Sequence, residues 1–536
     1  MRYLLACMVL ALFAKAAIAQ TDGNGNARKW GDWQTWGDQG NGTYVNPVLP
    51  SDYSDIDCIR VGSDYYAISS TFQFSPGMII LQSKDLVNWT IASHVVNDLN
   101  QISPEMNWDK MNRYGKGIWA GSVRYHGNKF WVYFGTPDEG YFMSSAKNIS
   151  GPWEPLHTVL SAKGWDDCCP FWDDDGQGYL VGSNYADAYK IHLFKLTADG
   201  RDIVKESDKV IHQSRGSEAN KLYKINGWYY HFFSEVRPEG RAVMMERSKS
   251  IWGPYDDVKQ VNHAEKQYYE PNQGGLVDTQ NGDWYFYTHH GSGDWSGRIN
   301  SLLPVTWIDG WPIIGEVGAD GVGRMKWIGK MPVKGTKILT PQSSDEFNES
   351  VLPPQWEWNY QPRADKWSLS QRPGWLRLTA FKPIEPNNLL KAGNTLTQRV
   401  LRTRANQIII KLDLAGMADG EITGLCHFNN PAHFATLGIK CSGSTKTLEY
   451  KTVGADAIAG AVITLNMIWL RSTWGLDGLS QYAYSLDGKT FTDFGAPYQL
   501  AWGSYRGDRV GIFNFNNNAD AGYVDVDFFH YDYSHN

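Results

Sequence analysis

The chain lacks the cysteine patterns that define disulfide-rich and zinc-binding proteins. Only six cysteines occur in 536 residues and their spacing is irregular, so a disulfide framework is not expected. Neither a CxxC nor an HExxH motif is present, which argues against a zinc site. Cys168 and Cys169 are adjacent, and we expect both to be buried thiols. Cys426 and Cys441 could still pair within the C-terminal part of the chain.

Positive charge is not in excess, and long apolar runs are missing beyond the N-terminus. The 50 Lys and Arg residues are outnumbered by 57 Asp and Glu residues, which gives a net charge of −7 and a pI of about 6.0. This balance argues against nucleic acid or an anionic membrane surface as a partner.

No stretch after residue 19 approaches the roughly 20 apolar residues of a membrane-spanning helix. We therefore expect no nucleic-acid partner and no membrane span.

The first 19 residues have the pattern of a signal peptide. They begin with Met1-Arg2, continue through an apolar run and end in Ala17-Ile18-Ala19, a small-x-small cleavage pattern. Cys7 comes too early to leave an apolar segment before it, which argues against a lipoprotein signal. We predict an exported protein, periplasmic if the source is Gram-negative and secreted otherwise.

Aromatic residues and glycine are abundant. The chain has 24 Trp, 29 Tyr, 21 Phe and 54 Gly, a composition that favours many short strands and tight turns over helices. Aromatic rings can also stack on the apolar faces of sugars, although all-β cores use Trp and Tyr for packing as well. Composition alone therefore predicts an all-β protein and leaves sugar binding as one of two explanations for the aromatic content.

A turn followed by a compact aromatic strand recurs at intervals of about 50 to 65 residues. The five cases are Gly62–Ile68, Gly127–Tyr133, Asp175–Val181, Asn226–Phe232 and Asn281–Tyr287. Periods near 50 residues with several strands each are typical of β-propeller blades. From residue 345 the pattern changes to short alternating strands with Gly and Asn turns, which suggests a jelly-roll β-sandwich. The predicted fold is a five-bladed β-propeller followed by that sandwich.

These changes of pattern define the predicted domains. They are a signal peptide over 1–19, an N-terminal extension over 20–42, a propeller catalytic domain over 43–331, a linker over 332–344 and the sandwich over 345–536.

Three short acidic motifs lie in order along the propeller region, each just before or within an aromatic strand. They are Tyr53–Asp57, Asp166–Trp172 and Ser217–Tyr223. Separate carboxylates are what acid/base hydrolysis of a glycosidic bond needs, because one protonates the leaving oxygen while another activates water. Asp55 stands near Asp52 and Asp57, and any of these three might cap a turn, while Asp167 directly follows Asp166. The run 173–175 reads as a hairpin turn.

Several of these segments resemble glycoside hydrolase family 43. The matching segments in the propeller region are Asn46–Pro50 through Asp55, Arg60–Gly62, Tyr65-Tyr66, Phe171–Gly176, Glu218 before Leu222–Lys224, and Gly297-Arg298 before Pro304–Trp307. Those in the C-terminal region, Asp345–Asn348, Trp356 and Trp367–Leu369, resemble the concanavalin-like sandwich that follows many such propellers. The resemblance covers essentially the whole chain after the signal peptide.

This resemblance implies a five-bladed enzyme that hydrolyses non-reducing-end α-L-arabinofuranosyl or β-D-xylosyl units with inversion. By motif position, Asp55 would be the general base, Glu218 the general acid, and Asp167 the residue that orients the acid and tunes its pKa. A neighbouring carboxylate can raise the pKa of a catalytic Glu toward neutrality. An inverting site needs acid and base about 6.5–9.5 Å apart, which carboxylates from different blades could meet at one end of the channel.

The same resemblance suggests residues around the substrate. Arg298 matches a substrate-binding Arg, whose planar fork suits hydroxyls or the acidic cluster. The predicted substrate-binding residues are Arg298, Phe74, Trp119 and Gln273. His289 and His290 are weak candidates for positions near the propeller axis, where relatives sometimes hold calcium or water, and a structural role is favoured for both. No cofactor is required, and a structural Ca²⁺ ion is compatible with this prediction.

The sequence also departs from the family pattern beside the carboxylates. Cys168 stands where Pro commonly follows Asp167, the residues 219–221 replace Gly-Pro-His after Glu218, and Gly121 replaces Pro after Trp119-Ala120. None of these changes removes a carboxylate, but together they allow altered specificity or weak activity.

We predict an exo-acting inverting glycosidase that removes α-L-arabinofuranosyl units from plant hemicellulose oligosaccharides, from xyloglucan or arabinoxylan. The alternative is a β-D-xylosidase acting on xylo-oligosaccharides, since both sugars present similar hydroxyl geometry. A distant alternative is a non-catalytic carbohydrate-binding propeller, against which the three carboxylates argue. A retaining fructan hydrolase is less compatible, because its Asn-Asp-Pro-Asn and Arg-Asp-Pro motifs are absent.

Overall fold

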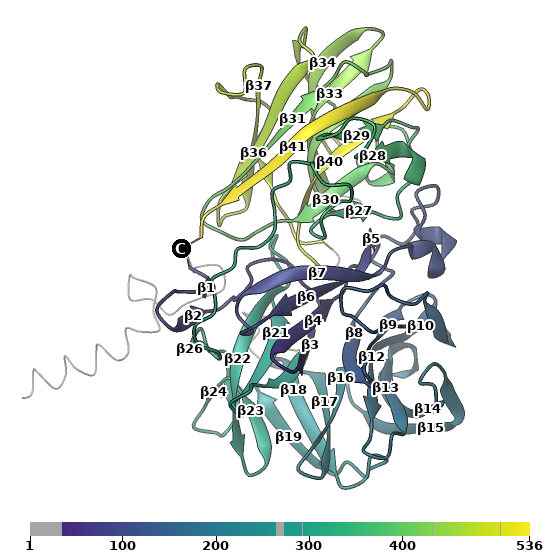
Figure 1. The fold of residues 1–536 in the computed structure, drawn as a ribbon, viewed down its shortest axis with the longest axis vertical. Coiled ribbons are helices and arrows are strands. Elements are labelled where there is room, and N and C mark those ends of the chain that lie inside the picture. Colours follow the sequence, from purple (N-terminus) through teal and green to yellow (C-terminus); the bar gives the residue numbers. More distant parts are fainter. Residues whose placement is uncertain (1–34, 264–272, 292, 431–432, 504, 536) are drawn as a thin grey trace, which may run out of the picture.

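The computed structural model describes residues 35–263, 273–291, 293–430, 433–503 and 505–535. Within these ranges the chain is mostly strand and loop, which confirms the prediction of an all-β protein (Figure 1). No helix in this part of the chain is long and apolar enough to cross a membrane. The helical segments are single 3-10 turns, η2 (Leu99–Gln101), η3 (Pro104–Met106), η4 (Tyr185–Asp187), η5 (Ala364–Lys366) and η6 (Leu389–Lys391). The predicted signal peptide lies outside the described residues.

The first part of the chain forms consecutive sheets, each built mainly from antiparallel pairs of strands that lie close together in the sequence. The first contains β3 (Asp57–Val61), β4 (Asp64–Ser69), β6 (Gly77–Ser83) and β7 (Trp89–Val96). The second contains β8 (Gly121–His126), β9 (Lys129–Thr136), β10 (Gly140–Ala146) and β11 (His157–Ser161). The third contains β12 (Trp165–Trp172), β13 (Gly178–Asn184), β14 (Lys190–Leu196) and β15 (Ile203–Gln213).

Two further sheets follow in the same order. The fourth contains β16 (Glu218–Ile225), β17 (Trp228–Arg237), β18 (Gly240–Ser248) and β19 (Asp257–Asn262), extended by β25 (Gly323–Arg324) and β24 (Glu316–Val317). The fifth contains β20 (Gln273–Asp278), β21 (Trp284–His290), β22 (Ile299–Ile308) and β23 (Trp311–Ile314). A small separate sheet joins β1 (Gly37–Asp38), β2 (Thr43–Val45) and β26 (Ile328–Lys330).

The first strands of these sheets form a closed ring. Strand β3 contacts β8, β8 contacts β12, β12 contacts β16, β16 contacts β20, and β20 contacts β3. Apolar side chains fill the space between neighbouring sheets: Ile80 of the first sheet and Phe134 of the second belong to one buried cluster, and Ala67 of the first and Tyr287 of the fifth belong to another. Strands such as β6, β10 and β13 are buried along almost their whole length because both of their faces are covered, whereas β15 and β19 are partly exposed. Full burial of one such side chain contributes about 1.5–3 kcal/mol.

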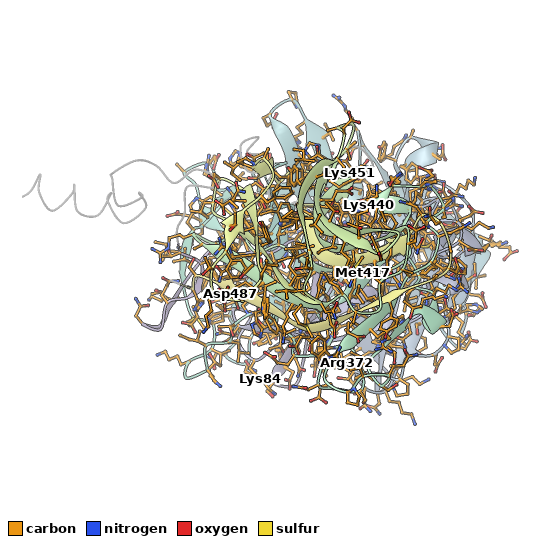
Figure 2. The ribbon with its side chains drawn as sticks, turned by 90° about the horizontal axis from the view of Figure 1, so that it is seen from above. Lys84, Arg372, Met417, Lys440, Lys451 and Asp487 are labelled. Carbon is orange, nitrogen blue, oxygen red and sulfur yellow. The ribbon has the colours of Figure 1, made fainter. Side chains whose placement is uncertain are left out.

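The C-terminal part is a sandwich of two sheets, above the ring in Figure 1 and facing the viewer in Figure 2, where it carries Met417, Lys440 and Lys451. One sheet has the order β35 (Ile458–Val462), β34 (Thr445–Thr452), β33 (His433–Ser442), β32 (Glu421–Asn430), β40 (Arg509–Asn516), β30 (Thr395–Arg399), β27 (Glu357–Asn359) and β5 (Phe74–Ser75). The other has the order β28 (Trp367–Ser368), β29 (Leu376–Thr379), β41 (Tyr523–Tyr533), β31 (Asn406–Asp413), β36 (Met467–Trp474), β37 (Leu479–Ser485) and β38 (Thr492–Asp493), and β39 (Tyr498–Gln499) also pairs with β37.

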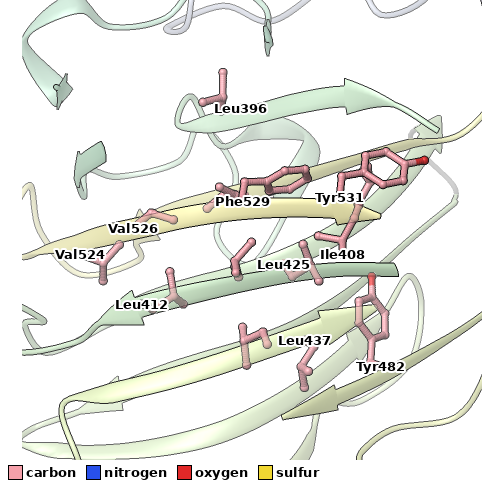
Figure 3. Close-up of a cluster of buried hydrophobic side chains, with 14 of the residues drawn as sticks. Leu396, Ile408, Leu412, Leu425, Leu437, Tyr482, Val524, Val526, Phe529 and Tyr531 are labelled. Carbon is pink, nitrogen blue, oxygen red and sulfur yellow. The ribbon is translucent and has the colours of Figure 1, made fainter. Parts of the chain in front are cut away.

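The sandwich core follows directly from alternation along its strands. In β31 every second residue is buried, which turns Ile408, Ile410 and Leu412 toward the opposite sheet. Figure 3 shows side chains of this cluster, among them Leu425 and Phe529, gathered between the strands. This period-two burial is the pattern expected of sheets with one covered face.

The sandwich contacts the ring of sheets through a strand pair and through buried polar side chains. Strand β5, which lies in the sequence between β4 and β6, pairs with β27 of the sandwich. The buried Glu357 of β27 accepts from Arg399 at 2.9 Å and lies 3.3 Å from His94 of β7. Arg399 also donates to the backbone oxygen of Asp52 at 2.7 Å. The sandwich thus contacts the segment that carries the first acidic motif.

Candidate active site

The three predicted catalytic carboxylates come from three sheets of the ring, at positions where the backbone is irregular. Asp55 precedes β3 and has a φ of 56°, and Asp167 lies in β12 with a φ of 45°. Glu218 begins β16 and is followed by Ala219 with a φ of 69°. Register shifts interrupt the pairing of β12 and β16 at these residues. Such bulges re-aim side chains, and left-handed non-Gly residues are enriched at functional sites.

These carboxylates line one cavity of about 320 Å³. Arg298, Trp119 and Gln273, which the sequence suggested as substrate-binding residues, also line it, together with His289. The remaining lining residues are Phe72, Lys116, Ala120, Pro137, Asp138, Asp166, Tyr185, Tyr189 and Tyr505. The structure therefore brings seven predicted residues together in one pocket, although the sequence separates them by more than two hundred positions.

Asp55 is held by three contacts from different segments. Its Oδ1 accepts from Arg298 at 2.7 Å, and its Oδ2 accepts from the Ser70 hydroxyl at 2.7 Å. Its backbone N–H donates to Nδ1 of His289 at 2.6 Å. Burial holds the pKa of His289 well below its usual value, so this imidazole is neutral and its Nδ1 can accept. The Asp55 carboxylate is consequently fixed in orientation while facing the cavity.

Asp167 is an acceptor shared by two donors. Its Oδ2 accepts from the backbone N–H of Ala219 at 2.5 Å and from Nε2 of Gln273 at 2.8 Å. Burial, followed by the charges of Glu218 and Asp55, raises the pKa of Asp167 to about 7, against the opposing effect of Lys221. Asp167 therefore touches the residue next to Glu218 and retains a proton to a much higher pH than an ordinary carboxyl group.

Glu218 is the most accessible of the three carboxylates. Its side chain is 28% exposed, and its Oε1 lies 3.1 Å from Nη1 of Arg241. The guanidinium also donates to the Gly216 carbonyl at 2.8 Å and so ties the segment before β16 to β18. A carboxyl group at the mouth of a pocket can reach both the bound sugar and the solvent side, as a proton donor to a leaving group must.

The neighbouring acidic residues have other roles. Asp57 pairs with Arg124 at 2.7 Å and accepts from the Val123 N–H at 2.9 Å, which ties the first sheet to the second. Asp52 accepts from the backbone N–H of Arg298 at 2.8 Å. Asp173 accepts from Lys224 at 2.5 Å within a surface turn. Asp166, by contrast, lines the cavity with the three catalytic candidates.

The rim of the pocket is aromatic, and one of its rings comes from the sandwich. Trp119 meets Tyr185 at a centroid distance of 6.2 Å and Tyr505 at 6.0 Å. Tyr505 precedes β40, and the guanidinium of Arg298 lies 5.6 Å from its ring. The backbone oxygen of Tyr505 accepts from the Ser54 hydroxyl at 3.3 Å. Nothing in the local sequence around Tyr505 marks it as a pocket residue, because its place there depends on how the two parts dock.

One predicted substrate contact is wrong. Phe74 is fully buried in β5, where it packs on Phe428 with centroids 6.3 Å apart, and the Arg509 guanidinium lies 4.0 Å from its ring. Pairing of β5 with the sandwich turns this ring away from the cavity. Phe72, two residues earlier and with a φ of 55°, lines the cavity instead.

The predictions for histidine and cysteine have mixed outcomes. His290 is buried and meets Trp327 at a centroid distance of 5.9 Å, and it is not among the residues lining the cavity. In the described residues no group of three or more His, Cys, Asp or Glu side chains is arranged to hold a metal ion. Cys168 and Cys169 are buried thiols, as predicted. Cys426 and Cys441 are both free and therefore do not pair.

The arrangement can perform acid/base chemistry on a neutral ligand. An oriented carboxylate on one side of the cavity can accept a proton from water, and a carboxyl group from another strand can donate one to a leaving oxygen. The aromatic rim offers apolar faces, and Arg298 and Gln273 offer donors for hydroxyl groups. These are the components of a carbohydrate-binding acid/base site.

Known proteins share this combination. Residues 44–312 match the model of glycosyl hydrolases family 43, and residues 344–532 match that of the β-xylosidase C-terminal concanavalin A-like domain. A β-xylosidase of Formosa agariphila is 35% identical over 549 residues, covering 93% of this chain and 92% of the relative. A non-reducing end α-L-arabinofuranosidase of Bacteroides ovatus is 30% identical over 359 residues, covering 63% of this chain and 65% of the relative.

A solved structure is similar over almost the whole chain. The bifunctional GH43-CE protein of Bacteroides eggerthii superimposes with a TM-score of 0.81 at 28% identity, over 94% of this chain and 64% of that one. The present chain thus spans less than two thirds of that protein.

Proposed function

We propose, since the chain belongs to glycosyl hydrolases family 43, that it is an exo-acting β-D-xylosidase that releases xylosyl units from the non-reducing ends of xylo-oligosaccharides. The observation that carries this choice is the 35% identity to a β-xylosidase across 93% of the chain. The α-L-arabinofuranosidase expected from sequence alone is supported by a relative of lower identity and shorter coverage. It becomes the second candidate.

The fold supports this proposal through its geometry. We infer that the ring of sheets is a five-bladed propeller, whose inner strands β3, β12 and β16 deliver Asp55, Asp167 and Glu218 to one end of the axis. The cavity of about 320 Å³ is at the lower end of the range of roughly 300–1,000 Å³ for ligand pockets. A pocket of this size favours binding of a chain end over binding along a polysaccharide.

In the proposed mechanism the reaction proceeds in one step with inversion. Asp55, oriented by Arg298 and Ser70, removes a proton from a water molecule, which attacks the anomeric carbon. Glu218 gives its proton to the glycosidic oxygen as that bond breaks. Asp167 acts through the backbone N–H of Ala219, which positions the acid segment, and through its charge, which favours retention of one proton by the acidic pair. No cofactor takes part.

A direct comparison of substrates tests the sugar specificity. The purified full chain is assayed with aryl β-D-xylopyranoside, xylobiose and aryl α-L-arabinofuranoside. We expect kcat/KM for the xyloside to exceed that for the arabinofuranoside by about tenfold or more, a difference that pocket contacts can supply. A preference for the arabinofuranoside would overturn the xylosidase proposal and favour the second candidate. Proton NMR of the first product anomer tests inversion separately.

Matched amide substitutions test the roles of the carboxylates. Glu218→Gln and Asp55→Asn keep size but remove acid or base function, and each is expected to lower kcat by about 10²–10⁴. Glu206→Gln is the control, because Glu206 is an exposed residue of β15. Near-normal turnover of xylobiose by either pocket variant would refute its assigned role.

We also propose that the protein is exported and meets plant cell-wall oligosaccharides. Export is supported by the pattern of residues 1–19, and the mass of the protein recovered from the periplasm or medium tests it. Retention of residues 1–19 would contradict it. The proposed independence from cofactors is tested by dialysis against a chelator, after which turnover should be unchanged; a loss that Ca²⁺ restores would establish a structural calcium site.

A further inference from the structure

We propose that Asp166 is a further substrate-binding residue, whose carboxyl group makes a hydrogen bond to a hydroxyl of the terminal sugar in the pocket. This inference rests on the proposed glycosidase function and deepens it. The carboxyl group is separate from the three to which catalytic roles are assigned above.

The backbone of β12 explains how two consecutive residues can face one cavity. In a regular strand neighbouring side chains point to opposite faces. Here the pairing of β12 with β13 shifts register between Asp166 and Cys169, and Asp167 adopts a φ of 45°. The bulge cancels the alternation, so that Asp166 and Asp167 both line the pocket.

The Asp166 carboxyl group makes no side-chain hydrogen bond among the described residues. The residue is only 7% exposed, and its Oδ1 is buried without a hydrogen-bond partner among the described residues. Its backbone groups are engaged: the carbonyl accepts from the Tyr141 hydroxyl at 2.8 Å. Oδ1 itself is closed off from the cavity, whereas Oδ2 also makes no hydrogen bond among the described residues, and a nearly buried carboxyl group without partners is costly. Asp166 lines the cavity, so a bound ligand can supply the missing hydrogen bond to Oδ2.

The charges around Asp166 favour a neutral carboxyl group. Burial, and after it the charges of Asp167, Glu218 and Asp55, raise the pKa of Asp166 well above its usual value, whereas Arg241 opposes this shift. A protonated carboxyl group has one O–H donor and retains acceptor capacity. It can therefore match a sugar hydroxyl, which also donates and accepts, without adding another negative charge to the pocket.

The depth of the side chain indicates which sugar unit it meets. Tyr189, at the rim, is 36% exposed, whereas Asp166 and Asp167 are 7% and 6% exposed. An exo-acting pocket holds the terminal unit at its inner end and the leaving group at its mouth. Asp166 accordingly belongs with the terminal unit.

Two variants separate hydrogen bonding from charge. Asp166→Asn retains a neutral donor and acceptor of the same size, and Asp166→Ala removes both. For aryl β-D-xylopyranoside we expect Asp166→Asn to stay within about threefold of the wild type in kcat/KM, and Asp166→Ala to lose about 10- to 100-fold. Equal losses in both variants, or none in Asp166→Ala, would overturn the proposal.

Deoxy substrates then identify the contact. Wild type and Asp166→Ala are compared on aryl xylosides that lack the 2-, 3- or 4-hydroxyl in turn. For the one analogue without the bound hydroxyl, the substitution should cost less than about twofold, because the hydrogen bond is already missing. If every analogue shows the full loss, Asp166 does not bind a sugar hydroxyl. A loss seen with xylobiose but not with the aryl xyloside would assign Asp166 to the leaving unit and also refute the proposal.

Failure of the proposed function is distinguishable from failure of this inference. A wild type that turns over only the arabinofuranoside refutes the xylosidase assignment, and the same two variants and deoxy series are then applied to that sugar. If Asp166→Ala does not fold, the Asp166→Asn variant and a second isosteric substitution, Asp166→Leu, provide the comparison, with folding checked by circular dichroism.

Discussion

Gln273 donates a hydrogen bond from Nε2 to Oδ2 of Asp167 at 2.8 Å. The orientation of its amide is defined on the other side, because Nζ of the buried Lys221 donates to Oε1 at 3.3 Å. Oδ2 of Asp167, which accepts from the Ala219 N–H, is therefore also oriented by Gln273, and Gln273 is in turn oriented by Lys221. Gln273 couples the fifth sheet of the ring to the third through this bond.

Removal of the amide should weaken catalysis without unfolding the protein. Gln273→Leu deletes the donor to Asp167 and leaves that carboxyl group less well oriented. We expect kcat/KM to fall by about 10- to 100-fold, the cost of one hydrogen bond to a charged group, with the loss mainly in kcat. Gln407→Leu, on β31 of the sandwich, is the control. Unchanged kcat in Gln273→Leu would mean that Asp167 is oriented by Ala219 alone.

The pH dependence of turnover should report Asp167. Burial and the charges of Glu218 and Asp55 raise the pKa of Asp167 to about 7, so Asp167 loses its proton near neutrality. We expect kcat/KM to decline on the alkaline side from about pH 7, because the ionised Asp167 repels the two carboxylates beside it. Asp167→Asn cannot ionise at this position, so this limb should be absent from its pH–rate profile, with reduced maximal activity. The same alkaline limb in the variant and the wild type would contradict the role of Asp167.

A buried acid in the sandwich should make stability pH-dependent. Burial raises the pKa of Glu421 to about 8, well above the usual 4.5. Because the folded state binds this proton more tightly than the unfolded state does, the stability it contributes is lost as pH rises from about 4.5 to 8. Glu421→Gln should therefore raise Tm at pH 8 by a few °C, on the order expected for a domain of this size.

At pH 5 the same substitution should change Tm little. The comparison of variant with wild type in differential scanning calorimetry cancels the titration of groups common to both proteins, such as the buried histidines. A Tm difference that is the same at pH 5 and pH 8 would show that the Glu421 proton is not linked to folding.

The aromatic ring that the sandwich contributes should matter for substrate binding. Tyr505 meets Trp119 at 6.0 Å and Arg298 at 5.6 Å. Tyr505→Ala should raise KM for xylobiose by about three- to tenfold, the scale of one lost aromatic contact, whereas Tyr505→Phe should stay near the wild type. Tyr523→Ala, on β41, serves as the control. Equal KM values for Tyr505→Ala and the wild type would show that the sandwich does not shape the site.

Much of the site was predictable because its motifs are local. Asp55, Asp167 and Glu218 lie in short acidic motifs next to aromatic strands, and their roles were assigned by the position of these motifs in the resemblance to family 43. Arg298 lies in a matching segment, and it lines the cavity together with Trp119 and Gln273. The prediction for Phe74 was wrong because strand β5 pairs with β27 of the sandwich. No local sequence pattern indicates this pairing between distant segments.

The sequence by itself determined that this is an all-β protein with aromatic repeats, three ordered acidic motifs and a family 43 pattern. The all-β character and the repeats follow from the alternation of side chains along strands and from turn residues, which act over a few positions, whereas the family pattern is a resemblance of short motifs. Only the tertiary structure decided that Asp166 shares a wall with Asp167, that Lys221 orients Gln273, and that Tyr505 reaches the pocket from the sandwich. Those relationships depend on bulges and on the docking of distant segments, where contacts between residues far apart in the chain set the geometry.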